Sequence, residues 1–196
     1  SDRGSLQNCA KLYFNYCSGC HSLKLMRYSR MASDLGLTEQ QVMDNLNFTG
    51  AKFGEQIPPS MQASDGKTWF GAAPPDLSLM ARARGVDYIY TYLKSFYLDP
   101  SRPLGWNNTV FPNASMPNAL WSLQGIQTAT FKADAHGGAP IFEKFELHQA
   151  GALDAHGFDE VARDIANFLQ YAAEPAALQR KAVGVWVLLF LGLFTL

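Results

Sequence analysis

The sequence has few charged residues and no excess of either sign. Only 17% of its 196 residues are charged, and 16 basic residues stand against 17 acidic ones. Because basic and acidic residues are nearly equal in number, the chain has no excess of positive charge with which to bind the phosphates of nucleic acid. Nucleic-acid binding is excluded on this ground. At 47% hydrophobic residues the chain is too apolar for a disordered tail, and its length suits one domain with a core of its own.

Cysteine is also scarce, with three residues in the chain. An odd number this small cannot form a disulfide framework. Two of the three, Cys17 and Cys20, belong to the pentapeptide Cys-Ser-Gly-Cys-His that ends at His21. A zinc site would need a second ligand pair, and a redox CxxC would need a βαβ context, so both readings are disfavoured. The third, Cys9, is most simply a small buried residue, with an intermolecular disulfide as the alternative.

The pentapeptide is the attachment signature of c-type haem. On one helical turn Cys17, Cys20 and His21 stand at positions i, i+3 and i+4 and project from the same face. Two thiols on that face can add to the two vinyl groups of a haem, while the imidazole lies under the iron. The sequence therefore predicts one covalently attached haem c with His21 as an iron ligand.

Met116 is the predicted second axial ligand. It lies far downstream of His21 and precedes Pro117, which holds the Met116 backbone extended. A neutral thioether favours ferrous iron and raises the potential, as in His/Met cytochromes. Such an iron has no open position, so electron transfer is favoured over peroxidase or oxygen chemistry. Met61, which follows Pro58 and Pro59, is the alternative ligand.

Haem propionates need positive charge when the porphyrin is buried. Arg82 and Arg84 are candidates for charge-assisted hydrogen bonds to them, although single arginines are more often solvated. Four aromatic residues are candidates for packing on the ring, with ordinary core packing as the alternative. They are Tyr13, Phe14, Tyr88 and Trp106.

The fold class predicted from periodicity is mostly α with long loops. Apolar residues recur at spacings of three and four in several segments, and no alternating strand pattern is strong. Asp76 is predicted to cap a helix that begins after Pro75. The other expected helices cover residues 5–20, a short segment after a capping box of Thr38 and Gln41, and residues 86–97 and 158–171. Residues 49–75 and 99–117 are expected to be loops, and residues 127–155 are assigned no regular structure.

The C-terminal segment lacks charge altogether, with no charged residue from Ala182 to Leu196. It is apolar on every helical face, which no amphipathic surface helix explains. The 14 residues from Val183 reach about 21 Å as a helix, less than the roughly 30 Å of a bilayer core, which favours a buried core helix. Because the run stops without a polar cap, we instead predict the start of a truncated transmembrane anchor over residues 175–196, after a haem domain over residues 1–174.

Four stretches resemble the cytochrome c1 family, the haem subunits of cytochrome bc1 complexes. The block Pro-Pro-Asp-Leu-Ser followed by Arg-Ala-Arg is more specific to that family than the haem pentapeptide, as is Ala-Ala-Glu-Pro before a terminal apolar helix. In this sequence the four stretches are residues 15–22, 74–84, 116–117 and 161–175.

The resemblance implies roles for individual residues. Cys17 and Cys20 would hold the haem, and His21 and Met116 would be its axial ligands. Arg84 matches the propionate-binding arginine of the family, with two further residues of the implied haem site close to it in sequence, Tyr88 and Pro75. Two departures are noted: Cys9 stands where relatives commonly have a small residue, and the loop between Asp99 and Trp121 lacks a cysteine pair that some members have.

The resemblance also implies the function. The chain would pass single electrons from a Rieske iron–sulfur protein to cytochrome c as a subunit of ubiquinol–cytochrome c reductase, with no bond chemistry of its own. Cytochrome b, membrane lipid and a dimeric complex are the other implied partners. The haem domain would lie on the periplasmic or intermembrane side, against the weak opposite signal of Arg180-Lys181. The alternative is a free or membrane-tethered c-type cytochrome outside any quinol-oxidising complex.

Overall fold

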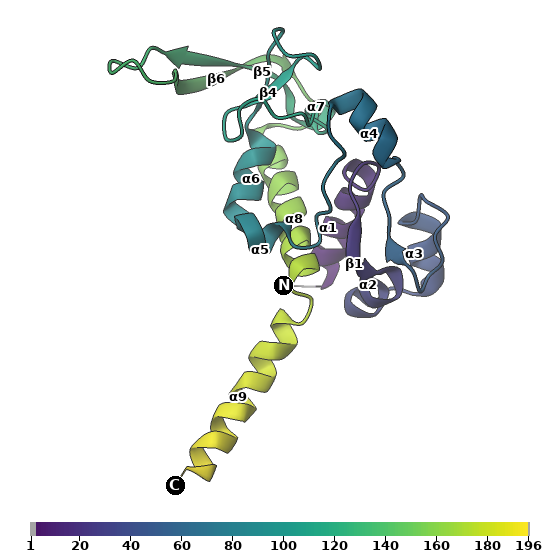
Figure 1. Cartoon of the computed structure of the whole chain (residues 1–196). Coiled ribbons are helices and arrows are strands. Elements are labelled where there is room, and N and C mark those ends of the chain that lie inside the picture. Colours follow the sequence, from purple (N-terminus) through teal and green to yellow (C-terminus); the bar gives the residue numbers. More distant parts are fainter. Residues whose placement is uncertain (1–2, 196) are drawn as a thin grey trace.

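The computed structural model describes residues 3–195. It contains a helical domain, a long hairpin at one end of that domain and a helix that leaves the other end (Figure 1). Its helices are α1 (Arg3–Tyr16), α2 (Tyr28–Leu35), α3 (Glu39–Asn45), α4 (Ala63–Phe70), α5 (Met80–Arg84), α6 (Val86–Lys94), α7 (Trp121–Gln124), α8 (Ala155–Ala173) and α9 (Ala177–Phe194). Its strands are β1 (Leu23–Arg27), β2 (Gln56–Ile57), β3 (Phe96–Leu98), β4 (Trp106–Asn108), β5 (Gly125–Lys132) and β6 (Ile141–Ala150).

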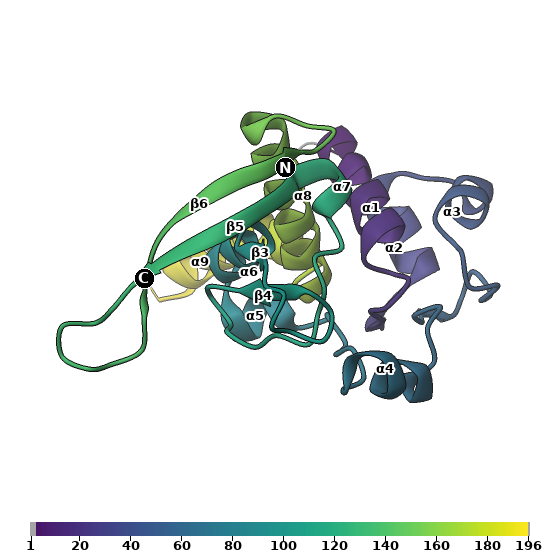
Figure 2. The same cartoon turned by 90° about the horizontal axis from the view of Figure 1, so that it is seen from above.

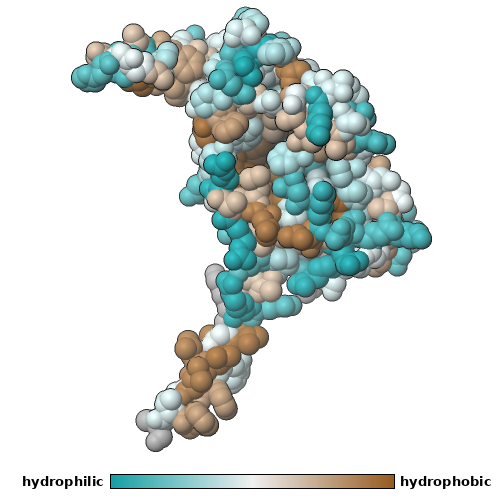
Figure 3. All heavy atoms as spheres, in the orientation of Figure 1, coloured by the Kyte–Doolittle hydropathy of each residue, from teal (hydrophilic) through white to brown (hydrophobic). Residues whose placement is uncertain are grey.

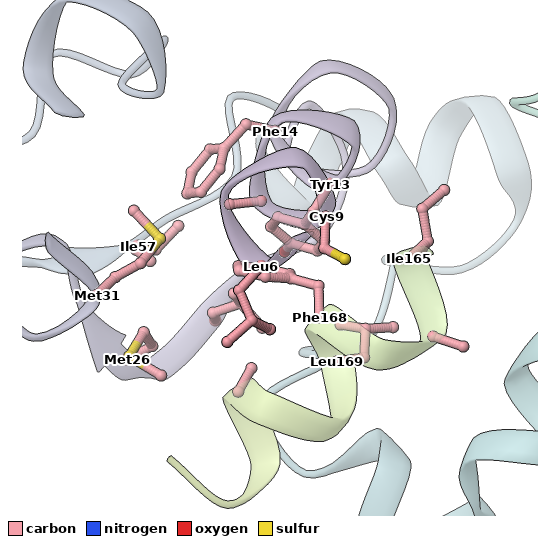
Figure 4. Close-up of a cluster of buried hydrophobic side chains, with 14 of the residues drawn as sticks. Leu6, Cys9, Tyr13, Phe14, Met26, Met31, Ile57, Ile165, Phe168 and Leu169 are labelled. Carbon is pink, nitrogen blue, oxygen red and sulfur yellow. The ribbon is translucent and has the colours of Figure 1, made fainter. Parts of the chain in front are cut away.

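The core lies between α1 and α8, which are more than a hundred residues apart in sequence (Figure 4). Tyr13 on α1 meets Phe168 on α8 with a centroid separation of 5.0 Å, and neither residue is exposed to solvent. Cys9 is also buried there, at 1% exposure, as the sequence predicted for a small apolar residue. The apolar stripes predicted on both helices are therefore confirmed, and they supply the frame from which the site is built.

One helix start follows its predicted capping, and a second has a cap that was not predicted. Thr38 and Gln41 form the full reciprocal capping box at the start of α3. Asp154 caps α8 by accepting from the Gly157 amide at 2.7 Å, so this helix begins three residues before the predicted Phe158.

The predicted absence of regular structure over residues 127–155 is wrong. Strands β5 and β6 pair antiparallel over most of this stretch and form a hairpin whose loop reaches beyond the rest of the domain (Figure 2). Most residues of β6 are exposed on both faces, so no buried face imposes the alternation by which strands are recognised. Gln127 ties the hairpin to the domain, because its side-chain amide donates to the carbonyl of Phe96 at 2.7 Å.

The predicted loop over residues 49–75 is also wrong in part, since it contains β2 and all of α4. Gly66 in the middle of α4 conceals the helix from propensity reasoning, because glycine disfavours helix interiors. A Cβ on Gly66 would lie 2.6 Å from the Cδ of Pro74, so the chain passes too close for a side chain. Two further predictions need correction. The segment Tyr28–Leu35 is helical although it was not predicted so, and Asp76 caps no helix, because α5 begins only at Met80.

Helix α9 points away from the domain and carries a continuous apolar surface (Figure 3). It begins at Ala177, after a turn that contains Pro175, so Pro175 precedes the helix instead of lying in its first turn. Its described apolar side chains are largely exposed, with Trp186 at 74% and Leu193 at 78%. Within residues 3–195, however, no helix combines the length and the apolar character needed to cross a membrane.

Candidate cofactor site

His21 is held in one orientation by two contacts. Its ring Nδ1 lies 2.8 Å from the carbonyl oxygen of Pro75, and because that oxygen can only accept, Nδ1 carries the proton. The Tyr13 hydroxyl donates to the His21 carbonyl at 3.0 Å. Burial lowers the pKa of His21 and favours the neutral imidazole, although the Pro75 hydrogen bond and the charge of Asp76 act in the opposite direction. Neutral Nε2 is therefore left as the nitrogen that can bind a metal, the arrangement usual for ligating histidines.

Cys17 and Cys20 lie in a turn after α1, because the helix ends at Tyr16 and not at Cys20 as predicted. The turn keeps helical spacing, since the amides of His21 and Cys20 both donate to the Cys17 carbonyl, at 2.9 and 3.1 Å. The three residues thus keep the relation expected on one helical turn. Both thiols are free and partly buried. Burial raises the pKa of Cys17 to about 12, with a smaller contribution from Cys20, and burial also raises the pKa of Cys20.

The segment around Pro75 is fixed to the chain just after His21. The Asp76 carboxylate accepts from the Ser22 hydroxyl and the Lys24 amide, both at 2.7 Å, and from the Ser78 amide at 3.0 Å. Burial alone would raise the pKa of Asp76, but these hydrogen bonds outweigh it and the pKa is lowered. The Leu77 amide adds a bond to the Ser22 carbonyl at 3.0 Å. Together these contacts place the Pro75 carbonyl opposite the His21 ring, a function of Asp76 that the sequence reasoning missed.

Met116 belongs to a second group of contacts. Its Sδ lies 3.6 Å from the Tyr92 hydroxyl, which donates to it, and Tyr92 stacks on Tyr88 at 6.0 Å. Burial and the neighbouring Tyr88 raise the pKa of Tyr92 to about 12. The sequence reasoning named Tyr88 and missed Tyr92, although α6 presents both on one face at a spacing of four. By contrast, the sulfur of Met61 packs against Gly66 of α4.

The loop that carries Met116 is organised by two buried asparagines. Asn108 accepts from the amides of Val110 and Phe111 and donates to the Tyr92 carbonyl at 2.9 Å. Asn107 accepts from the Asn113 amide at 2.8 Å. The loop therefore has internal polar supports besides its prolines. Asn107 is only 7% exposed, which accords with this supporting role inside the loop.

The two arginines predicted to bind the haem propionates have fewer contacts than His21 or the Met116 loop. Arg82 and Arg84 are both exposed, and the Arg84 guanidinium lies over the Tyr88 ring at 5.6 Å from its centroid. Of the predicted packing residues, Tyr13 and Phe14 are buried in the α1–α8 core. Trp106 instead lines a pocket of about 300 Å³ between the end of α4 and the Met116 loop.

The arrangement suits an iron porphyrin held by two thiols and an oriented imidazole. Among the described residues no group of three or more His, Cys, Asp or Glu side chains is placed to hold a metal ion. Met116 and His21 occupy separate hydrogen-bonded groups, as expected if the cofactor itself joins them.

Comparison with known proteins supplies the family. The model of the Cytochrome C1 family matches residues 1–196. The chain is 49% identical to cytochrome c1 of Allochromatium vinosum over 97% of its own length and 79% of the relative's. It is 30% identical to cytochrome c1 of Rhodospirillum rubrum over 99% of its own length and 78% of the relative's. A protein named ammonia monooxygenase gamma subunit, from Nitrosomonas europaea, is 38% identical over 97% of this chain and 77% of the relative.

Proposed function

The chain belongs to the cytochrome c1 family, and we propose that Cys17 and Cys20 hold its haem c, with His21 and Met116 as the axial ligands. The observation that carries this assignment is the hydrogen bond from His21 Nδ1 to the Pro75 carbonyl. It fixes the tautomer whose free Nε2 can bind iron, and it links the pentapeptide to the segment that is most specific to the family.

When bound, haem c supplies a one-electron couple between ferric and ferrous iron. His21 orients the metal-binding nitrogen, and the backbone of Pro75 polarises the imidazole through Nδ1. Met116 supplies a neutral sulfur, and Tyr92 holds that sulfur through its hydroxyl group. These residues fix both ligand positions, so the chain moves electrons and makes no covalent change in a substrate.

The chain is accordingly the haem-bearing electron-transfer subunit of a cytochrome bc1 complex, with cytochrome b and a Rieske iron–sulfur protein as its complex partners. We assign it the step between the Rieske protein and a soluble or membrane-bound cytochrome c. A dimeric complex with bound lipid completes the proposal. A free carrier outside the complex is not favoured, because the resemblance covers the whole chain, including its apolar end.

We further propose that residues 175–196 form the beginning of a membrane anchor and that residues 1–174 form the haem domain on the periplasmic or intermembrane side. Support comes from the apolar side chains of α9, of which the described ones are largely exposed (Figure 3). Exposed surface of this extent is costly in water and suits a lipid environment. At the start of this helix, Arg180 forms an ion pair with Glu174.

The ligand assignment is tested by the visible and near-infrared spectra of the purified protein and of Met116→Ala. We expect a low-spin haem c whose methionine–iron charge-transfer band is lost in the variant. Met61→Ala is the matched control and should keep the band. A band that survives in Met116→Ala and disappears in Met61→Ala would transfer the ligand role to Met61. Carbon monoxide binding to the reduced native protein would instead indicate an open iron position.

A further inference from the structure

Arg102 is a partly buried cation with incomplete hydrogen bonding. Its Nη2 donates to the Asn113 carbonyl at 3.1 Å, but its Nε is buried without a hydrogen-bond partner among the described residues. This Nε is the one buried side-chain nitrogen or oxygen in that part of the chain that has no partner. A charged donor removed from water and left unbonded is costly, so native proteins rarely retain one without a ligand.

No carboxylate of the described chain neutralises this guanidinium at ion-pair distance. Asp99 interacts electrostatically with Arg102, but both of its carboxylate oxygens already accept other hydrogen bonds. One accepts from the amide and hydroxyl of Ser101, and the other accepts from the Asn107 side chain at 2.8 Å. The charge of Arg102 therefore remains available for an anion from outside the described residues.

Arg102 lines the pocket of about 300 Å³. Its walls combine aromatic rings with this one cation, and they come from the end of α4 and from the Met116 loop. The principal lining residues are Trp69, Phe70, Arg102, Leu104, Trp106 and Ser115. Ser115 directly precedes Met116, so the pocket adjoins the proposed ligand loop. Flat apolar walls with a single cation suit a carboxylate carried by a flat apolar ring.

Helix α4 separates this pocket from the thioether turn. The Met61 amide, just before α4, donates to the Gly19 carbonyl between the two cysteines at 2.8 Å. The eight residues of α4 then extend about 12 Å before Trp69 and Phe70 reach the pocket. The propionates of haem c leave the ring at the edge away from its thioether-forming carbons. A haem attached at Cys17 and Cys20 would therefore extend its propionates away from the thioether turn, and Arg102 is the cation that lines the pocket beyond α4.

We propose that Arg102, through its guanidinium group, binds a haem propionate and so helps to set the reduction potential. This inference rests on the haem site proposed above and adds a second arginine to Arg84. The two come from different elements, α5 and the Met116 loop, and a haem presents two propionates. Arg102 is a positioning residue that acts on the iron through the propionate charge, because removing a nearby cation destabilises the electron-rich ferrous state.

The test measures the midpoint potential between pH 6 and 8 for the whole complex in detergent, with Arg102→Gln and Arg102→Lys. For a unit charge that acts over a distance on the order of 12 Å in a medium of effective dielectric near 20, its loss should lower the equilibrium constant for reduction about tenfold. Tenfold corresponds to about 59 mV for one electron. The lysine variant should recover most of this change. Arg163→Gln on α8, whose side chain is exposed and paired with Glu160, is the matched control and should leave the potential unchanged.

Resonance Raman spectra of the same samples report the propionate bending mode directly. We expect this mode to shift in Arg102→Gln and to stay in place in the Arg163 control. An unshifted mode with a native potential in Arg102→Gln would overturn the proposal. So would an equal fall in potential in the glutamine and lysine variants together with loss of the methionine–iron band, because that result would mean that Arg102 only supports the loop that carries Met116. Absence of a low-spin His/Met spectrum in the native protein would instead overturn the haem-site assignment itself. If Arg102→Gln binds no haem, the proposal is tested on Arg102→Lys alone: a native potential with a shifted propionate mode supports it, and an unshifted mode overturns it.

Discussion

The two sides of the proposed haem site are built with very different amounts of polar support. The His21 side has a ring hydrogen bond at 2.8 Å, backed by an Asp76 carboxylate that receives three further bonds. The Met116 side has one contact to the ligand atom itself, at 3.6 Å from the Tyr92 hydroxyl. Its loop is held at a distance from the sulfur, by Asn107 and Asn108.

This difference indicates that the His21 side is formed by the chain alone, while the Met116 side depends on the cofactor for its last contact. The order fits the chemistry of attachment. The thiols and imidazole must be placed before the thioethers form, whereas a methionine can bind iron afterwards. We therefore expect changes near Asp76 to affect the fold and haem attachment together, and changes near Met116 to affect the spectrum more than the fold.

The largest effect is expected for Asp76→Ala. The change leaves the Ser22 hydroxyl and the amides of Lys24 and Ser78 without their acceptor. Because hydrogen bonds to a charged group contribute more than neutral ones, and this carboxylate is partly exposed, we expect a loss of about 3 kcal/mol in the free energy of unfolding. Guanidinium unfolding of the full chain in detergent, followed by circular dichroism, measures it.

The matched control is Asp44→Ala, an exposed carboxylate on α3, which should change stability by less than about 0.5 kcal/mol. The covalently bound haem should fall in Asp76→Ala and not in the control. A stable Asp76→Ala protein with full haem content would contradict the claim that this side is the prearranged one.

A smaller loss of stability, with a larger spectral change, is expected for Asn108→Ala. Asn108 is 1% exposed, and its side chain bonds the amides of Val110 and Phe111 and the Tyr92 carbonyl. Its removal should cost about 2 kcal/mol and loosen the loop that presents Met116. We expect a weakened methionine–iron band at room temperature while the haem stays covalently attached. The exposed Asn45→Ala on α3 should show neither effect, and a native band in Asn108→Ala would show that the loop needs no support from Asn108.

Acid should act on the His21 side first. The pKa of Asp76 is lowered in the folded chain, so its stabilising contribution is present above the unfolded value of about 3.9 and is lost as pH falls through the folded value. The difference in stability between the native protein and Asp76→Asn should therefore be constant from pH 7 to about 5 and should shrink below about pH 4. Chemical denaturation at a series of pH values measures it. A difference that grows on acidification would assign the opposite sign to the shift.

Much of this fold could be predicted from the sequence wherever a signal is local. The capping box at Thr38 and the apolar stripe of α8 are confirmed, and the pentapeptide residues keep the predicted helical spacing. Helix boundaries differ from the predicted ones where a turn can replace the last helical residues. Helix α1 ends at Tyr16, and the two cysteines follow in a turn that keeps helical spacing.

The missed features depend on partners far away in the sequence. Periodicity cannot show that the Pro75 carbonyl, 54 residues after His21, would receive its ring proton, nor that Asp76 would bond to Ser22 instead of capping a helix. Gly66 weakens the helical signal of α4 for a reason, the close passage of Pro74, that only the folded chain displays. Neither face of the β5–β6 hairpin is fully buried. Its strands therefore do not need the alternation of apolar and polar residues by which a strand is recognised in a sequence.

The smallest effect is expected for Tyr92→Phe, which removes one hydroxyl and leaves the ring in place. An O–H···S contact at 3.6 Å is weak, so stability should change by less than about 1 kcal/mol. The methionine–iron band should nevertheless shift or broaden, because this hydroxyl is the described hydrogen-bond donor to the Met116 sulfur. Tyr16→Phe, at a partly buried tyrosine next to the haem pentapeptide, controls for loss of a hydroxyl elsewhere and should leave the band unchanged. An identical band in both variants would mean that the iron alone fixes the sulfur. The contrast between the two sides would then be larger than the described contacts indicate, because the Met116 side would have no hydrogen-bond support at its ligand atom.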